Sequence, residues 1–199
     1  MFNNFYPLTP KKKPIFDFTH HFLLATPNIT TGIFANAVIY VCRHDSQGIL
    51  GLMINKPNRH NRIVKLFEEL GVVVTMADLH ERFPLKGGPV SPEVGFVLHT
   101  GQGAWASSFI IRENVCITTS RDILQHIASG HGVQHVELCL GHCRWRVGQL
   151  EDEIEQGDWL VAPADSEILF NTPYEQRYEK VCQKLGVNFD IFSTEIGYA

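Results

Sequence analysis

Short apolar runs, separated by turn-forming residues, recur along the chain and predict several strands. Two runs, residues 37–42 and 49–54, flank the turn-forming segment 44–48 and predict a β-hairpin. Both runs are apolar on consecutive positions, so we expect both strands to be covered on two faces. A further apolar segment, residues 20–29, is interrupted by Pro27.

The later part of the chain adds further expected strands. Residues 93–100 predict one strand, and residues 107–120 predict two that are joined by a turn at positions 113–114. Residues 133–141 and 158–163 each predict one more. Strands therefore come first as hairpins and later alternate with helices.

Apolar residues at helical spacing predict helices at residues 62–72, 120–130, 148–157 and 172–186. Glycine closes the first, third and fourth of these, because it adopts the left-handed conformation that ends a helix. Ser120 is expected to be the N-cap of the second helix.

The last helix carries the clearest signals. Thr172 and Glu175 have the spacing of a capping box, with Pro173 at the first helical position. One apolar stripe is expected to face the core; its members are Tyr174, Tyr178, Val181, Cys182 and Leu185.

This order of elements predicts an α+β fold, with a mixed, largely antiparallel sheet and flanking helices. No internal repeat and no low-complexity linker divides the chain. We therefore expect residues 1–19 to form an N-terminal tail and residues 20–199 to form a single domain.

Composition narrows the class of protein. Of 199 residues, 44% are apolar and 19% are charged, which is ordinary globular composition. The net charge of −4 argues against broad attraction to nucleic acid. No apolar run is long enough to span a membrane. Five cysteines, with no export signal, favour reduced thiols and a cytoplasmic location.

Metal binding is one chemistry that the cysteines and histidines suggest. His131, His135, Cys139 and Cys143 recur at intervals of four. Residues four apart on a strand lie roughly 13 Å from one another, whereas zinc ligands lie about 2.0–2.3 Å from the metal. One strand cannot bring all four to one ion, so we predict no metal and no cofactor.

Nucleophilic catalysis by Cys143 is a second candidate. The sequence places this cysteine in a turn before a helix, beside Arg144 and Arg146, which would lower the pKa of a thiol. However, neighbouring residues of an extended chain point to opposite faces, so His142 is poorly placed as its base. No catalytic constellation follows from these residues.

Two strand-to-helix junctions favour anion binding instead. Residues 118–121 and 141–149 each present free backbone amides at a helix start, with an arginine nearby. The same features also serve simple helix capping, so both interpretations stay open. The Gly87-Gly88-Pro89 turn is neither a Walker loop nor a dinucleotide fingerprint, although its glycines let a ligand or another backbone approach.

An ordered set of motifs resembles the YqgE/AlgH family of bacterial proteins. The motifs are HFLLATP at residues 21–27, GLMINKP at 51–57, GGPV at 87–90, GFVLH at 95–99, TTSRD at 118–122, LG at 140–141, Trp145, GQLE at 148–151, and Trp159. Each is weak alone, but their order along most of the chain is specific. The resemblance implies a cytosolic protein whose sheet is bent into a barrel-like shape. One member of the family is named as a regulator of alginate synthesis, and no reaction is established for the family as a whole.

The family pattern also shifts attention within the 141–151 junction. His142, Cys143 and Arg144 depart from it, whereas Trp145 and Gln149 fit it. A reaction shared by the family therefore cannot depend on the histidine or the cysteine, although a redox role of Cys143 in this protein alone stays open. The candidate ligand-binding residues are Asn55, Gly87, Gly88, Pro89, Ser120, Arg121, Gly141, Trp145, Gln149 and Glu151.

Three functions are compatible with these features. The favoured one is a non-catalytic cytosolic protein that binds a protein partner or a small anionic ligand, in transcriptional or metabolic regulation. The first alternative is a hydrolase or redox enzyme with its site at the 141–151 junction. The second is direct nucleic-acid binding, which requires several arginines on one face; they are Arg112, Arg121, Arg144 and Arg146.

Overall fold

The computed structural model describes residues 16–101, 103 and 105–189 and consists of one sheet with helices on its faces. The strands are β1 (His21–Ala25), β2 (Val38–Asp45), β3 (Gly48–Met53), β4 (Leu85–Lys86), β5 (Val90–Thr100), β6 (Ser108–Arg112), β7 (Val115–Thr118), β8 (Val136–Trp145) and β9 (Trp159–Pro163). The helices are α1 (Ile63–Glu69), α2 (Ile123–Ser129), α3 (Gln149–Glu155) and α4 (Tyr174–Leu185). A 3₁₀ turn at Ala77–His80 and a π-helical turn at Glu167–Asn171 complete the described elements.

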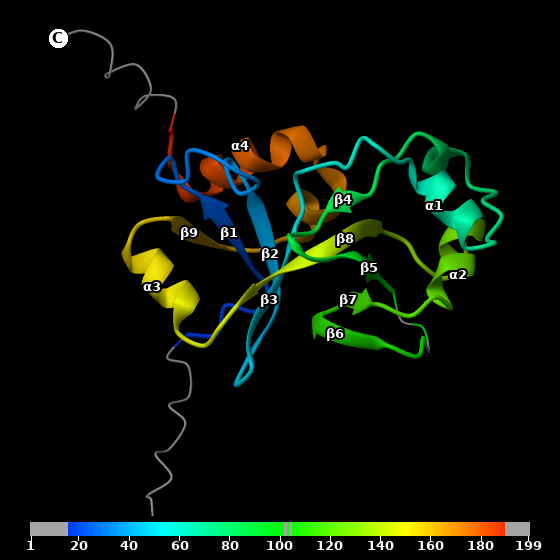
Figure 1. The fold of residues 1–199 in the computed structure, drawn as a ribbon, viewed down its shortest axis with the longest axis horizontal. Coiled ribbons are helices and arrows are strands. Elements are labelled where there is room, and N and C mark those ends of the chain that lie inside the picture. Colours follow the sequence, from blue (N-terminus) through cyan, green and yellow to red (C-terminus); the bar gives the residue numbers. More distant parts are fainter. Residues whose placement is uncertain (1–15, 102, 104, 190–199) are drawn as a thin grey trace, which may run out of the picture.

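The sheet is a half-barrel with the strand order β6-β7-β5-β8-β3-β2-β1-β9. Its neighbours in this order are antiparallel, and the short β4 pairs with β8 in parallel. The first half of β8 pairs with β5, and residues 143–145 pair with β3. In Figure 1, β8 crosses the middle of the molecule, with α1 and α2 at one end and α3 and β9 at the other. The α+β fold class is confirmed.

Gly141 is the point at which β8 changes partners. Its φ of 72° lies in the left-handed region that favours glycine. Gly87 and Gly88 cross β8 at this point: a Cβ on Gly87 would lie 2.2 Å from the carbonyl oxygen of Gly141. Gly87 also donates its N–H to the carbonyl of Leu140 at 2.8 Å. The glycines of both motifs therefore allow two backbones to touch.

Three apolar clusters hold the helices on the sheet. The first lies under α4 and includes Phe22, Tyr40, Leu52, Leu98 and Val181. The second lies under α3 and includes Met53, Trp145, Leu150 and Trp159. The third joins α1 and α2 to the sheet and includes Phe67, Val97, Ile123, Ile127 and Leu138. Burying each such large side chain contributes roughly 1.5–3 kcal/mol relative to leaving it exposed.

Most elements agree with the sequence prediction, but two boundaries were wrong. The predicted strand 133–141 does not stop at Gly141, because the left-handed glycine bends the strand and β8 continues to Trp145. Ser120 is not the N-cap of α2: Asp122 holds that position, and the hydroxyl of Ser120 donates to its carboxylate at 2.5 Å.

The capping box before α4 was also wrong. Pro173 is the N-cap residue, and no side chain caps the helix start. Thr172 instead donates its hydroxyl to the carbonyl of Glu167 at 3.0 Å, and Glu175 pairs with Arg59 at 2.8 Å. The apolar stripe of the helix is confirmed: Val181 and Cys182 are buried, and its other three members pack against the same cluster.

The predicted N-terminal tail falls mostly outside the described residues. Residues 1–15 are not described, whereas Phe18, near the end of the predicted tail, is buried against the second cluster. Within the described residues, no helix combines the length and the hydropathy that a membrane span requires.

Candidate functional site

The predicted junction at residues 141–151 is held together by a carboxylate that the sequence analysis did not single out. Glu153 on α3 accepts hydrogen bonds from the indole N–H groups of Trp145 at 2.8 Å and Trp159 at 2.9 Å. Its other oxygen accepts from Gln149 Nε2 at 2.9 Å. Three donors thus fix one carboxylate, which pins α3 to β8 and β9.

These bonds occupy the polar groups of the Trp145 and Gln149 side chains, both candidate ligand-binding residues. The backbone N–H of Arg146 donates to Gln149 Oε1 at 3.1 Å. The cleft above α3, about 630 Å³ in volume, is lined by three carboxylates and one guanidinium, from Asp152, Glu153, Asp158 and Arg146. Such a lining repels an anion. Glu151 is partly buried, and its Oε2 makes no hydrogen bond to a described residue.

Asn55 lies apart from this junction. Its Oδ1 accepts from the N–H of Val38 at 2.8 Å, and its Nδ2 donates to the carbonyl of Asn36 at 2.8 Å. Asn55 therefore fixes the loop before β2, and it lines neither the cleft above α3 nor the pocket between α1 and α2 nor the cleft beside α4. The candidate residues Gly87, Gly88 and Gly141 do come together, at the backbone crossing described above.

Ser120 and Arg121 line a separate pocket of about 290 Å³ between α1, α2 and the sheet. Its walls are mainly apolar, from Leu66, Phe67, Leu70, Val97, Leu124, Leu138 and Leu140. Glu69 and Glu93 lie in the same lining as Arg121, so the charge of the pocket is mixed. Residues 141–149 do not reach this pocket, and the two predicted junctions therefore do not form one site.

Cys143 was predicted in a turn, and that placement was wrong. It lies within β8, is 1% exposed, and its thiol contacts the carbonyl of Gly87 at 3.4 Å. Burial raises the pKa of the Cys143 thiol to about 12. His142 packs its ring against Phe96 at 5.2 Å, as the alternation along a strand requires. In the described chain, no cluster of three or more His, Cys, Asp or Glu side chains is placed to hold a metal ion.

The burial of Cys143 and its raised pKa predict a thiol of low reactivity in the folded protein. At pH 8 we expect iodoacetamide to label Cys143 at least about a hundredfold more slowly in the native protein than in urea, because the thiolate is the reacting species. Peptide mass spectrometry over time measures both rates. Rapid native labelling confined to Cys143 would contradict this expectation.

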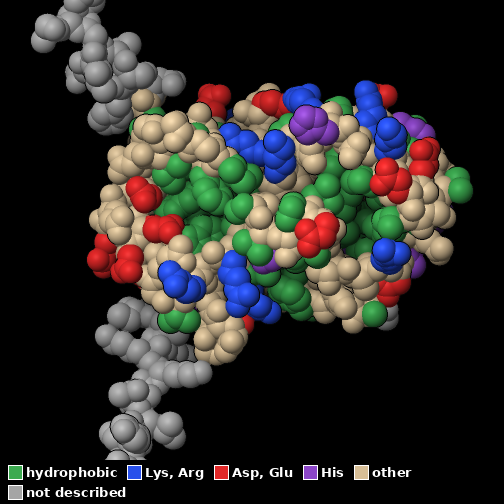
Figure 2. All heavy atoms as spheres, in the orientation of Figure 1, with side chains coloured by type: hydrophobic (Ala, Val, Ile, Leu, Met, Phe, Trp, Pro, Cys, Tyr) green, Lys and Arg blue, Asp and Glu red, His purple; other side chains and the backbone are tan. Residues whose placement is uncertain are grey.

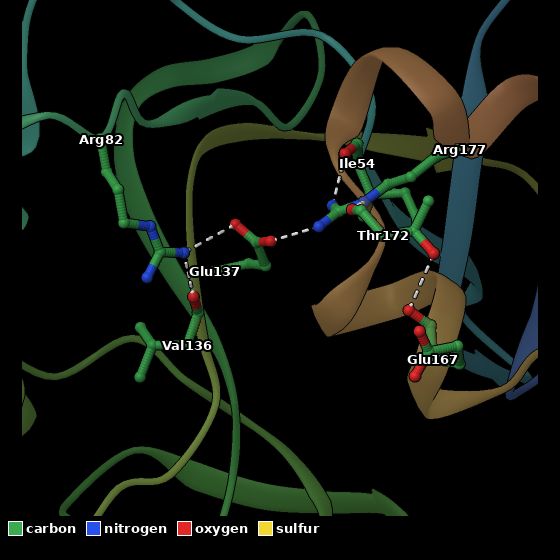
Figure 3. Close-up of polar contacts among 7 residues, drawn as sticks. All are labelled: Ile54, Arg82, Val136, Glu137, Glu167, Thr172 and Arg177. Atoms are coloured by element: carbon green, nitrogen blue, oxygen red, sulfur yellow. Dashed lines mark hydrogen bonds and ion pairs between the residues drawn. The ribbon is translucent and has the colours of Figure 1, made fainter. Parts of the chain in front are cut away.

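A cluster of buried charges lies elsewhere in the fold, between α4 and the start of β8. Glu137 accepts hydrogen bonds from Arg82 Nη2 at 3.2 Å and from Arg177 Nη2. Figure 3 shows the two guanidinium groups approaching this carboxylate from opposite sides. Arg177 also donates to the carbonyls of Thr172 at 2.9 Å and Ile54 at 2.7 Å. The cluster therefore joins α4, β8 and the loop before β4.

This cluster forms part of the lining of a cleft of about 430 Å³ beside α4. The side chains of Arg177 and Glu137 are 1% and 5% exposed, whereas that of Arg82 is 28% exposed. The other lining residues are Gln134, His135, Val136, Phe170, Asn171, Thr172, Pro173, Tyr174 and Glu175. Two arginines share the lining of this cleft, whereas the cleft above α3 and the pocket between α1 and α2 each have one.

None of these three charged residues was among the candidates predicted from the sequence, although two of them carried a signal. Arg177 falls on the apolar stripe of α4, three residues after Tyr174 and four before Val181. Glu137 interrupts the apolar residues of β8. A charge at a core position is rarely buried unless it is paired. Arg82 lies in a loop and carried no comparable signal.

The fold and the cleft together define an α+β protein with a half-barrel sheet, flanking helices and a charged cleft beside its last helix. The model of the AlgH-like family (DUF179) matches residues 22–190. A UPF0301 protein of Psychrobacter cryohalolentis is 56% identical over 181 residues, which cover 91% of this chain and 97% of that protein. The chain therefore belongs to the AlgH-like family, as its motifs predicted.

Solved structures agree with this assignment. The solution structure of the AlgH protein from Pseudomonas aeruginosa is 33% identical, has a TM-score of 0.73 and matches over 100% of both chains. A crystal structure of a protein from Corynebacterium diphtheriae has a TM-score of 0.65 at 19% identity, covering 88% of this chain and 91% of that one. The latter similarity shows the shared fold alone.

Proposed function

We propose that this protein is a non-catalytic, cytoplasmic regulator that binds a small anionic ligand in the cleft beside α4. The observation that carries the proposal is the charge of the buried cluster. Two guanidinium groups, of Arg82 and Arg177, face a single carboxylate, Glu137, at the floor of the cleft. Buried charges are costly unless they are balanced, so the excess positive charge favours an anion.

The acidic residue at the edge of the cleft does not offset this excess. Glu175 lines the cleft, but its carboxylate pairs with Arg59 at 2.8 Å. Arg59 in turn lies over the ring of Phe83, as does Arg62, with guanidinium-to-centroid distances of 5.6 and 5.3 Å. Arg62 pairs with Glu81 at 2.5 Å, so these two arginines are balanced, and the excess positive charge of the cleft comes from Arg82 and Arg177 against Glu137.

Arg82 is the residue best able to receive a ligand. Of the three guanidinium nitrogens of Arg82, only Nη2 donates hydrogen bonds to described residues. Its acceptors are the Glu137 carboxylate and the carbonyl of Val136. Its Nε–H and its Nη1 N–H groups are left for a ligand. Each of these groups can donate a single charge-assisted hydrogen bond to a carboxylate or phosphate oxygen, and such bonds are stronger than neutral ones.

The chemistry of the lining supports binding in preference to turnover. The hydroxyl of Thr172 donates to the carbonyl of Glu167, so it is not poised as a nucleophile. Elsewhere, Cys143 is a buried thiol with a raised pKa and lies on the opposite face of β8 from His142. A nucleophile needs a base within hydrogen-bond reach, and neither place offers that pair.

Charge distribution also favours a small ligand over nucleic acid. The described part of the face in Figure 2 carries Lys and Arg side chains in separate groups, with no continuous basic surface. Arg121 and Arg146 line different clefts. Nucleic-acid binding ordinarily uses basic residues clustered on one face.

Replacing Arg82 by glutamine tests the proposal. We expect the wild-type protein to bind inorganic phosphate or pyrophosphate in titration calorimetry, and Arg82→Gln to weaken this binding by about tenfold or more, because charge-assisted hydrogen bonds are lost. The fold should persist, since Glu137 and Arg177 remain a neutral pair; the free energy of unfolding should change by less than about 1 kcal/mol.

Arg146→Gln is the matched control, because it removes one arginine from the acidic cleft above α3. It should leave phosphate affinity unchanged. Equal losses in the two variants, or no binding of either anion by the wild-type protein, would overturn the assignment of this cleft.

A further inference from the structure

Three rings line the cleft beside the arginines, and they point to the class of ligand. We propose that the anionic group is carried on a planar ring system, as in a nucleoside monophosphate, with the phosphate at Arg82 and the ring against Phe170 and Tyr174. This inference rests on the proposed function of the cleft and adds the chemistry of the rest of the ligand.

The rings are held in place by contacts within the protein. Phe170, in the π-helical turn, lies 5.6 Å from the ring of His135, with an angle of 31° between the planes. Tyr174, at the start of α4, has the guanidinium of Arg177 5.7 Å from its ring centroid. Both Phe170 and Tyr174 are partly exposed, so each keeps some ring surface that a ligand can cover. Stacking of a base on an aromatic side chain is favourable for every base.

Amide side chains beside the rings can contact the edge of a heterocycle. Gln134 and Asn171 both line the cleft and are exposed. Asn171 donates from Nδ2 to Glu167 at 2.9 Å, which fixes its orientation and leaves its Oδ1 as an acceptor. An amide offers both donors and acceptors, as the edges of nucleobases do. The cleft of about 430 Å³ falls in the size range of small-molecule sites.

The other clefts lack this combination of groups. The lining of the cleft above α3 contains no aromatic residue among those described, and its charge is negative. The pocket between α1 and α2 contains one ring, that of Phe67, which is 1% exposed. Arginine, exposed ring surface and amide side chains therefore coincide beside α4, which is why we place a ring-bearing anion there and not a simple anion.

Titration calorimetry of the full chain with three probes tests the inference. We expect adenosine 5′-monophosphate to bind about tenfold more tightly than inorganic phosphate, because stacking adds to the charge contact. Adenosine should bind more weakly than the monophosphate. Equal affinities for the monophosphate and phosphate would overturn the ring inference and leave the proposed function standing. Binding of none of the probes would overturn both.

Two variants test whether the ring of the ligand contacts Phe170. Phe170→Leu keeps an apolar side chain and removes the ring; it should weaken monophosphate binding by about fivefold to tenfold and leave phosphate binding unchanged. Phe109→Leu, on β6, is the control and should change neither. An equal loss for both probes in Phe170→Leu would show an effect on the shape of the cleft and contradict the inference.

A second variant that removes a ring keeps the inference testable if Phe170→Leu does not fold. His135 is exposed and contacts Phe170, so His135→Gln removes a ring without disturbing a buried position. It should also weaken monophosphate binding selectively, by a smaller factor than Phe170→Leu. Unchanged monophosphate affinity in both folded variants would reject stacking in this cleft.

Discussion

Replacing Arg177 by methionine is expected to lower the free energy of unfolding by about 3–5 kcal/mol, because it strands a buried carboxylate. Arg177 is 1% exposed and makes hydrogen bonds to Glu137, Thr172 and Ile54. Methionine is also a long, unbranched side chain, so the loss reports mainly on charge and hydrogen bonds. Arg82 alone cannot compensate Glu137, since its own side chain is 28% exposed. Urea unfolding followed by circular dichroism measures the change.

Two further variants separate the charge effect from packing. Lys180→Met removes a positive charge from the exposed side of the same helix and should change the free energy of unfolding by less than about 0.5 kcal/mol. The double variant Glu137→Leu, Arg177→Met removes the buried charge pair and should recover much of the lost stability. A cost below about 1 kcal/mol for Arg177→Met alone would contradict the buried-pair interpretation.

The second large effect is expected for Gly141→Ala in β8. The alanine would keep a φ of 72°, and its Cβ would lie 2.5 Å from the carbonyl oxygen of Gly88 and 3.0 Å from that of Val90. A left-handed alanine costs about 1–2 kcal/mol, and forcing apart packed backbones costs about 1–3 kcal/mol. We therefore expect a loss of about 2–5 kcal/mol in urea unfolding.

Other glycines of this chain serve as matched controls. Gly148 has a φ of 83°, and no heavy atom lies within 4 Å of the position that a Cβ would take, so Gly148→Ala carries the conformational cost alone, about 1 kcal/mol. Gly95 on β5 is equally open and is not left-handed, so Gly95→Ala should change little. Equal costs at Gly141 and Gly148 would show that the backbone crossing contributes nothing.

The parts of the fold that could be predicted from the sequence are those set by local pattern. Consecutive apolar residues at 37–42 and 49–54 predict the β2–β3 hairpin, and the structure confirms it, with both strands extended into the turn. The stripe from Tyr174 to Leu185 predicts α4, because a helix of this length presents one face to the core. Predicting these elements does not require knowing which other elements they pack against.

The errors arose where a local signal has two structural outcomes. A glycine ends many strands, but Gly141 bends β8 and lets it continue, and the choice depends on the backbone of Gly88. Thr172 has the sequence of a helix cap, but the π-helical turn before it takes the hydroxyl. The two-residue β4 pairs in parallel with β8 and is too short to produce any periodic signal.

In the candidate site too, residues within a local motif could be predicted, whereas residues brought together by the tertiary fold could not. The motif residues Trp145 and Gln149 were singled out from the sequence, whereas Glu153, which both contact, was not. The charged cluster beside α4 combines residues 82, 137 and 177, which only the tertiary fold brings together. Residues so far apart in the sequence cannot be recognised as one cluster from a pattern of neighbouring residues.

The bent strand β8 connects two separate regions of the molecule. Glu137 at its start belongs to the charged cleft, and Trp145 at its end is bonded to the carboxylate that anchors α3. The bend between them is clamped at Gly141 by the backbone of the Gly87–Gly88 crossing. One continuous strand therefore contributes both to the charged cleft and to the attachment of α3, so a substitution that changes the bend at Gly141 alters the relative placement of these two regions.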